Sequence, residues 1–288
     1  MAARRSKADI ATLKTSLANI CGEYQRITVR QLFYQAVSRG LVAKTEKAYK
    51  GVVCRLTSDL RWSGELDMDQ ICDNTRAEKV RPQWRSMAEF IRTVRHAYRL
   101  NYWDHAPEFV QVWLEKEALS GVIRPMCDRY GVGLWVSRGY SSISMLSSAA
   151  EQLAVKTLVG IPGTVAQLGD HDPSGENIGQ VIHRDLIRLV EHHGGRPELV
   201  KFQRVALTVD QVSAWQLPTR PTKTSDSRSA NFDGESVELD AVPPDRLVGL
   251  VQQAILEHVD QTLWSQLQER QRQDEAAIRQ LVDRGEAC

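Results

Sequence analysis

Hydrophobic residues recur at helical spacing through the first sixty residues of the chain. The first run predicts an amphipathic helix over residues 6–24, because its apolar residues all fall on one face: Ile10, Leu13, Leu17 and Ile20. Apolar residues at three- and four-residue intervals form such a face when the backbone turns by 100° per residue. The N-terminal part of the chain is therefore expected to be helical.

A second helix is predicted to begin after Thr28. Gln31 follows three residues later, and this spacing is typical of a capping box. Gly40 is expected to end the helix. Tyr34 lies about 130° from the centre of the apolar stripe at 100° per residue, so we expect its phenol to be exposed. Arg30 lies one turn away from Tyr34, close enough for the two side chains to meet.

A third helix is predicted over residues 46–61, followed by a short extended stretch over residues 66–72. Three short helices and an extended segment are typical of a winged helix-turn-helix domain, which we place at residues 1–80. The candidate DNA-binding residues are the basic side chains of the third helix: Lys47, Lys50, Arg55 and Arg61. A small helical bundle with a solvated basic face remains the alternative.

The rest of the chain alternates between apolar runs and amphipathic segments. A helical linker is predicted over residues 81–106, and an α/β domain with a C-terminal helical extension over residues 107–288. Strands are expected at residues 109–115, 133–136, 165–168 and 200–207, separated by helices. This alternation favours a parallel sheet with right-handed crossovers, as in Rossmann-like domains. Residues 218–236 are poor in apolar side chains and are expected to form a long loop.

Acidic residues follow two of the predicted strands. Glu115 ends the first strand, and Asp170 and Asp172 follow the strand over residues 165–168. Side chains two residues apart on an extended segment point to the same side, so the two aspartates are expected to share one cation. Carboxylate oxygens suit Mg²⁺, with Mn²⁺ as a substitute. Glu115, Asp170 and Asp172 are therefore the candidate metal ligands.

A calcium-binding loop and an aspartate phosphatase both fit the surroundings of the aspartate pair less well. An EF-hand loop starting at Asp170 would need an acidic twelfth residue, and Val181 stands there. A phosphatase that uses an aspartate nucleophile would be expected to carry the pair on the first strand of its domain.

The charge is unevenly distributed although the net charge is only +1. Residues 1–100 carry 19 of the 37 lysines and arginines against 10 of the 36 acidic residues, so the remainder carries 18 against 26. A basic first third favours contact with a polyanion such as double-stranded DNA. The five scattered cysteines form no Cys-x-x-Cys motif, and the chain has no apolar run long enough for a membrane span. We expect a cytoplasmic, nucleoid-associated protein.

Three motifs resemble those of the topoisomerase VI A subunits and the related meiotic double-strand-break transesterase. Thr-Val-Arg-Gln-Leu-Phe-Tyr at residues 28–34 is similar to the family's winged-helix tyrosine motif, although Gln31 replaces its usual acidic residue. Val-Trp-Leu-Glu-Lys-Glu-Ala at residues 112–118 and Gly-Asp-His-Asp-Pro-Ser-Gly at residues 169–175 resemble the two halves of its Toprim domain. The resemblance covers about residues 25–260.

The resemblance implies a metal-dependent DNA transesterase. Tyr34 would be the nucleophile that forms a 5′-phosphotyrosyl bond, Arg30 would bind the phosphate, and Glu115 would belong to the catalytic metal site. In this family one protomer's tyrosine works with the partner's metal site, which implies a homodimer. No counterpart of the family's N-terminal extension and no glycine-rich ATP site is apparent, so strand passage would need a separate ATPase B-like subunit.

Two alternatives from different functional classes remain open. Related Toprim proteins, including plasmid- and phage-defence nucleases, hydrolyse DNA, and in such an enzyme Tyr34 would only pack or contact DNA. The second alternative is a non-catalytic DNA-binding protein that keeps both folds for assembly.

Overall fold

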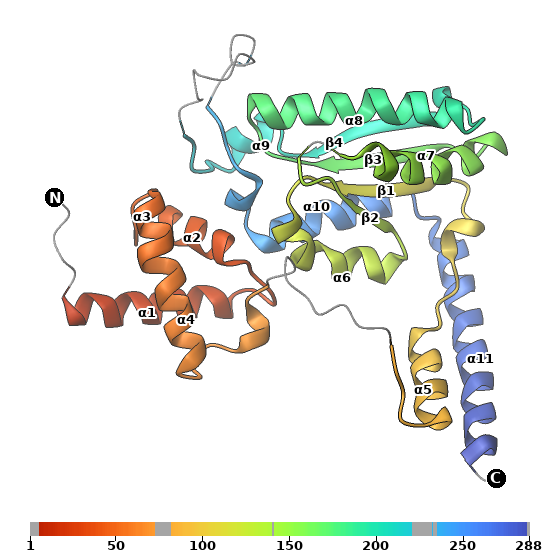
Figure 1. The fold of residues 1–288 in the computed structure, drawn as a ribbon, viewed down its shortest axis with the longest axis horizontal. Coiled ribbons are helices and arrows are strands. Elements are labelled where there is room, and N and C mark those ends of the chain that lie inside the picture. The colour runs from red at the N-terminus through yellow and green to blue at the C-terminus, as the bar shows by residue number, and fades with distance from the viewer. Residues whose placement is uncertain (1–5, 73–81, 140, 221–231, 233–234, 287–288) are drawn as a thin grey trace.

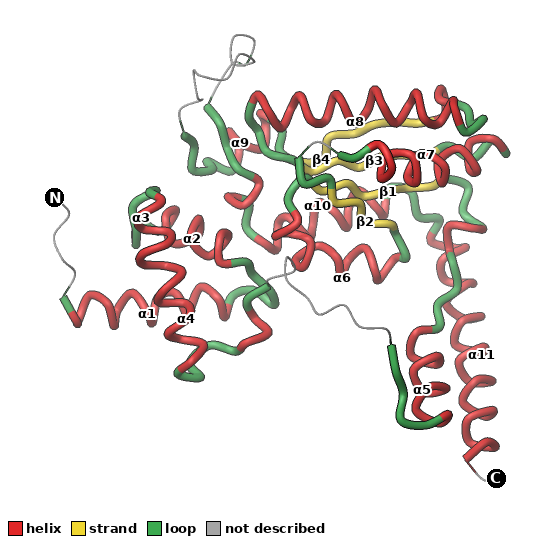
Figure 2. The backbone as a smooth tube through the Cα atoms, in the orientation of Figure 1, coloured by secondary structure: helices red, strands yellow, loops and turns green. Residues whose placement is uncertain are grey.

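The computed structural model describes residues 6–72, 82–139, 141–220, 232 and 235–286. Two helical regions flank a four-stranded parallel sheet (Figures 1 and 2). The α/β class expected from the alternation of strands and helices is confirmed. The predicted loop over residues 218–236 lies largely outside the described residues, as does the end of the predicted N-terminal domain at residues 73–80.

The first two helices begin with side-chain caps, and the cap of the second is the one that the sequence predicts. Helix α1 (Lys7–Gly22) is capped by Ser6. Helix α2 (Val29–Ser38) is capped by Thr28, whose side chain accepts a hydrogen bond from the Gln31 backbone while Gln31 caps the Thr28 backbone in return. Such a reciprocal pair satisfies two backbone N–H groups that would otherwise lack partners at a helix start.

The third predicted helix is one continuous helical segment with a change of pitch. It consists of α3 (Glu46–Ala48), the π-helical turn η1 (Tyr49–Cys54) and α4 (Arg55–Trp62). Its buried side chains include Val53, Leu56 and Leu60. The helix expected over residues 46–61 is therefore confirmed, with a widened turn in its middle.

The extended stretch expected over residues 66–72 is not a strand. Residues Met68–Gln70 form the 3₁₀ turn η2, and Ile71 makes a single parallel bridge to Ile27. The Gln70 side chain turns back to the Cys21 carbonyl at 2.6 Å. This bond and the apolar burial of Ile71 hold the segment against α1 in place of a hairpin.

The sheet contains β1 (Phe109–Leu114), β2 (Gly133–Val136), β3 (Gly163–Leu168) and β4 (Val200–Ala206) in the order β2-β1-β3-β4. All neighbouring pairs are parallel. The expected strands are confirmed within a few residues. Every residue of β3 is buried, as is typical of a parallel strand covered on both faces.

Helices cover both faces of this sheet (Figure 1). Helices α7 (Ile143–Leu158) and α8 (Pro173–His192) pack on one face, around Trp113 and Val165. Helices α6 (Ser120–Tyr130) and α10 (Pro244–Leu256) cover the other. The core on the α6–α10 face is continuous with the core of α1 and α2, so the N-terminal helices and the sheet share one hydrophobic cluster.

Three further helices complete the described chain. Helix α9 (Val209–Ala214), which the sequence did not predict, follows β4. Helix α5 (Met87–Ala97), in the predicted linker, lies beside α11 (Gln261–Glu286), and the two extend away from the sheet (Figure 1). The Tyr98 hydroxyl donates to Asp274 at 2.6 Å and fixes this pair. Among the described residues no helix is both long enough and apolar enough to cross a membrane.

Candidate functional site

The acidic residues lie at the carboxyl edge of the sheet, where β1 and β3 are neighbours. From these two central strands the chain crosses to opposite sides, to β2 and to β4, which makes this edge a topological switch point. Glu115 follows β1, and its carboxylate accepts a hydrogen bond from the Asp170 backbone at 3.1 Å. The two segments predicted to form one site are therefore in contact.

Two glycines allow this close approach. A Cβ on Gly169 would lie 2.7 Å from the Glu115 carboxylate, and a Cβ on Gly175 would overlap the Asp170 carbonyl. Side chains are thus excluded from both ends of the acidic loop. The loop backbone can then pack directly against Glu115 and against the first turn of α8.

A half-buried arginine fixes the backbone of the acidic loop. Arg204 on β4 donates to the carbonyls of Asp170 at 2.5 Å and Gly169 at 3.3 Å. It also donates to the Leu207 carbonyl at 2.9 Å and the Gln167 side chain at 3.2 Å. Burial lowers its pKa from the ordinary arginine value. Arg204 therefore positions the loop through its backbone carbonyl groups.

The three carboxylates differ in their surroundings. Burial, and next the negative charge of Asp170, raise the pKa of Glu115 to about 7. Burial also raises the pKa of Asp170, although Lys116 opposes that shift at 3.0 Å. Asp172 caps α8 by accepting from Gly175 N at 2.7 Å.

The positions of the three carboxylates agree only in part with the expected cation site. Its donors are hard oxygen atoms, and the pKa of Glu115 is raised by burial and, to a smaller extent, by the neighbouring Asp170 charge, which a divalent cation would offset. However, in the described residues no group of three or more His, Cys, Asp or Glu side chains is arranged to hold a metal ion. Asp172 faces its own helix and Arg220, at 3.6 Å, instead of sharing a ligand position with Asp170. The donor chemistry fits Mg²⁺, and the side-chain arrangement would have to change at Asp172.

Lys116 connects this loop to a second acidic pair that the sequence reasoning missed. Its ammonium lies 2.7 Å from Asp240 and 3.4 Å from Glu238, both of them buried. Burial alone would lower the pKa of Lys116, but the surrounding carboxylates outweigh it and raise that pKa. The signal was present, because Val-Glu-Leu-Asp-Ala at residues 237–241 repeats the spacing of the Asp170–Asp172 pair between apolar residues.

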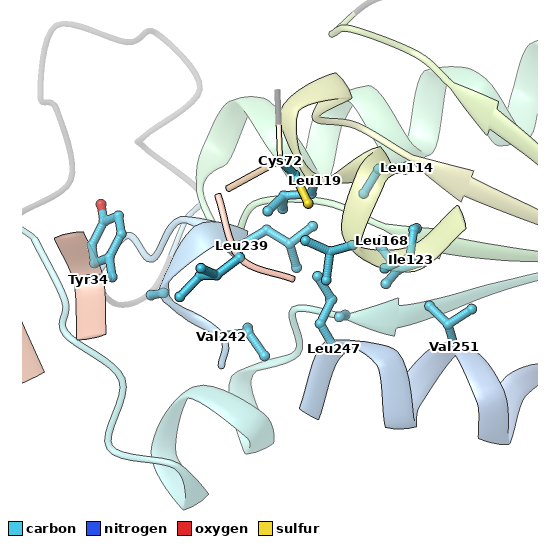
Figure 3. Close-up of a cluster of buried hydrophobic side chains, with 14 of the residues drawn as sticks. Tyr34, Cys72, Leu114, Leu119, Ile123, Leu168, Leu239, Val242, Leu247 and Val251 are labelled. Carbon is cyan, nitrogen blue, oxygen red and sulfur yellow. The ribbon is translucent and has the colours of Figure 1, made fainter. Parts of the chain in front are cut away.

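Tyr34 is not exposed, which corrects the expectation from helical periodicity. Its side chain is 2 % exposed and lies at the edge of the shared core, with its hydroxyl pointing away from the cluster (Figure 3). The reason is tertiary: the 3₁₀ turn η7 (Leu239–Ala241) packs against α2. Burial, and next the charge of Glu238, raise the pKa of Tyr34 above its ordinary value.

Arg30 lies near Tyr34 as predicted, but it is not free to bind phosphate. Its guanidinium carbon is 6.0 Å from the centre of the Tyr34 ring and 4.9 Å from that of Tyr49. The guanidinium forms a fork with Glu238, in which Nε donates to one carboxylate oxygen at 3.2 Å and Nη2 to the other at 3.1 Å. Arg30 therefore joins the tyrosine helix to the acidic site.

Three of the four candidate DNA-binding side chains are exposed. Lys47, Lys50 and Arg55 face solvent, and Lys50 and Arg55 pair within their own helix, with Glu46 and Asp59. Arg61 is half-buried instead and donates to the Met68 carbonyl at 3.1 Å. The 3₁₀ turn that replaces the expected extended stretch supplies this acceptor.

Comparison with known proteins returned no match: no protein-family model, no curated protein and no solved structure is similar to this chain. The function must therefore be argued from the residues and their arrangement.

Proposed function

We propose that this chain is a metal-dependent enzyme that cleaves double-stranded DNA by transesterification through Tyr34. The proposal includes a winged-helix role for the N-terminal helices and a Toprim role for the sheet domain. The observation that carries it is the line of ion pairs Arg30–Glu238–Lys116–Asp170, which joins the tyrosine helix to the acidic loop. Nucleophile, phosphate-binding arginine and carboxylates are thus proposed to form one connected site within a single chain, whereas the resemblance implies a site shared between two protomers.

The reaction would exchange one ester bond for another. The Tyr34 oxygen would attack the phosphorus, the bond from phosphorus to the 3′-oxygen would break, and that oxygen would leave as a hydroxyl. The buried phenol must first lose its proton, and its raised pKa opposes this. Arg30 already lowers this pKa, although burial and the charge of Glu238 together outweigh it.

Glu115 and Asp170 are the residues that would hold Mg²⁺, joined by Asp172 after it leaves its capping position. A cation bound there would neutralise charge that develops on the phosphate oxygens. The exposed Lys47, Lys50 and Arg55 would contact the DNA backbone. A homodimer would supply the two tyrosines that a double-strand break needs.

A hydrolytic nuclease is the second candidate, and a specific observation favours it. Tyr34 is almost fully buried with a raised pKa, as expected of a tyrosine that only packs. Glu115, with a pKa of about 7, could then accept a proton from an attacking water near neutral pH. Both candidates require the acidic loop and differ only in the attacking oxygen.

Metal-dependent cleavage, which both candidates share, is tested on supercoiled DNA with Mg²⁺ or Mn²⁺. Glu115→Gln should abolish cutting. Glu117→Gln is the matched control, since Glu117 lies two residues away and pairs with Arg138 outside the loop. Equal cutting by wild type and Glu115→Gln would refute the metal site, and absence of cutting in the wild type with every metal and DNA form would favour the non-catalytic alternative.

A further inference from the structure

Three basic side chains from separate parts of the chain surround one carboxylate. Arg30 of α2 lies 2.9 Å from Glu238, and Arg220 lies 2.8 Å from the other oxygen of the same carboxylate. Lys116, after β1, lies 3.4 Å away. The Glu238 side chain is 6 % exposed, so this carboxylate is almost removed from water.

Glu238 is the main partner of both arginines. Arg30 has one other carboxylate near it, Glu46 at 3.9 Å, and Arg220 has Asp172 at 3.6 Å. The two arginine side chains are 31 % and 36 % exposed, although the carboxylate between them is buried. Both guanidinium groups can therefore be approached from solvent.

A carboxylate and a phosphodiester present the same feature to such a site. Each offers two oxygens that share one negative charge, and a guanidinium fork binds either group with two parallel hydrogen bonds. The Lys44 ammonium adds a further positive charge nearby, 5.3 Å from the centre of the Tyr34 ring. A phosphate at the position of Glu238 would thus lie among four cations and beside the tyrosine.

We infer that Arg30, Arg220 and Lys116 form a binding site for one backbone phosphate of duplex DNA, and that Glu238 occupies it as an internal substitute until DNA displaces it. The inference rests on the proposed function, because it concerns the DNA site of that enzyme. It adds Arg220 and Lys116 as phosphate-binding residues, and it makes the conformation described here a closed one.

The backbone around Glu238 explains how this contact is coupled to the acidic loop. Residues 220 and 236 exchange two backbone hydrogen bonds of 2.9 Å, which place Arg220 beside Glu238. On the other side, the Leu239 backbone donates to Asp170 at 2.8 Å. Withdrawal of Glu238 would therefore loosen a ligand of the proposed metal site at the same time as it frees the arginines.

While Glu238 occupies the site, DNA can bind only those molecules in which the site is open. The apparent affinity for DNA is then the intrinsic affinity multiplied by the open fraction. Glu238→Gln, which keeps the size and removes the charge, should raise the affinity for a short duplex about tenfold, measured by fluorescence anisotropy with EDTA present. One additional phosphate contact should also increase the magnitude of the salt slope, the slope of the logarithm of the binding constant against the logarithm of the salt concentration, by about 1. EDTA makes this measurement independent of cleavage.

The matched control is Glu23→Gln. Glu23 also forms a fork with an arginine, Arg39, but on the surface of the N-terminal helices, and its loss changes the net charge equally. It should raise the affinity less than twofold with an unchanged salt slope. A purely structural role of Glu238 predicts instead that Glu238→Gln binds DNA no better than Glu23→Gln.

A double-mutant cycle with Arg220→Gln identifies the groups that bind the phosphate. Arg220→Gln should remove most of the DNA affinity that Glu238→Gln gains, and it should change the DNA affinity of the wild type little. If Glu238→Gln does not fold, Glu238→Asp retains the charge with a shorter reach and should show a smaller rise. Inorganic phosphate should compete with the duplex only weakly. If inorganic phosphate competes as strongly as the same concentration of duplex phosphate groups, the site binds a free anion and not the DNA backbone.

The outcomes separate this inference from the proposed function. Tighter DNA binding by Glu238→Gln, without DNA cleavage by the wild type, would support the phosphate site and contradict the proposed enzymatic activity. Cleavage by the wild type, with identical affinities for Glu238→Gln and Glu23→Gln, would keep the enzyme and overturn the phosphate site.

Discussion

Arg30 and Glu238 lie 208 residues apart in the sequence and form a fork of hydrogen bonds in the structure. Their pairing attaches the helix that carries Tyr34 to the turn that contacts the acidic loop. A guanidinium–carboxylate fork with a nearly buried carboxylate is stronger than a surface ion pair. This contact organises the candidate site, and it also blocks the groups that a substrate phosphate would need.

The Glu238 carboxylate should make the free energy of unfolding depend on pH in the acidic range. Burial opposes ionisation, but Lys116 and Arg30 outweigh it and lower the pKa of Glu238 to about 2. Because the folded-state pKa is below the unfolded value, this stabilisation is full above the unfolded pKa and is lost as the pH falls toward 2. It amounts to at most about 3 kcal/mol. Urea unfolding of wild type and Glu238→Gln should therefore converge at low pH, and parallel curves would contradict the pairing.

Glu115 should have the opposite effect. Its folded-state pKa of about 7 lies above the unfolded value, so the folded protein loses stability as the pH rises from about 4.5 to 7. Glu115→Gln cannot ionise and should be more stable than wild type at pH 8, by about 1–2 kcal/mol. Glu117→Gln should show no such gain in the same urea titration. Equal stabilities of wild type and Glu115→Gln at pH 8 would contradict the burial of the Glu115 carboxylate beside Asp170.

The close approach of the acidic loop to α8 should make Gly175 intolerant of substitution. Gly175→Ala would force a Cβ against the Asp170 carbonyl and shift the loop, at a cost of about 2 kcal/mol. Gly179→Ala, one turn along the same helix, is the control, because its Cβ would meet Arg204 at an ordinary 3.5 Å. Thermal unfolding should show a lower midpoint for Gly175→Ala alone. Equal midpoints would mean that the loop is not held at this distance.

The exposed basic side chains of the third helix should contribute to DNA affinity through phosphate contacts. Replacing Lys47, Lys50 and Arg55 together by glutamine should reduce the salt slope of duplex binding by about 2–3. The control replaces three exposed basic residues on other faces: Arg124, Arg184 and Lys201. An equal loss in both triple variants would indicate a diffuse charge effect without a defined DNA surface.

Local sequence rules predicted the elements of this fold well. The capping box at Thr28, the buried strands and the helices between them depend on neighbouring residues, so periodicity and caps suffice to find them. The short α9 was missed because six residues are too few to display a helical period. The extended stretch at residues 66–72 was wrong because the Gln70 contact to α1, which no local pattern contains, determines its path.

The candidate site was predicted in part for a similar reason. Parallel-sheet topology brings Glu115 and Asp170 together from strand ends, and this follows from the sequence. The burial of Tyr34 does not follow, because the face opposite the apolar stripe of α2 is covered by a turn some 200 residues later. Glu238 carried the same acidic spacing as Asp170, but only its tertiary contact with Arg30 reveals its place in the site.

The most direct test of the transesterase assignment is a denaturing gel of protein bound covalently to end-labelled DNA in the presence of Mg²⁺ or Mn²⁺. Wild type and Tyr49→Phe, which alters the other aromatic ring beside Arg30, should both form a 5′-linked adduct, and Tyr34→Phe should form none. Free cut ends in all three proteins, or an adduct that persists in Tyr34→Phe, would contradict the assignment of Tyr34 as the nucleophile.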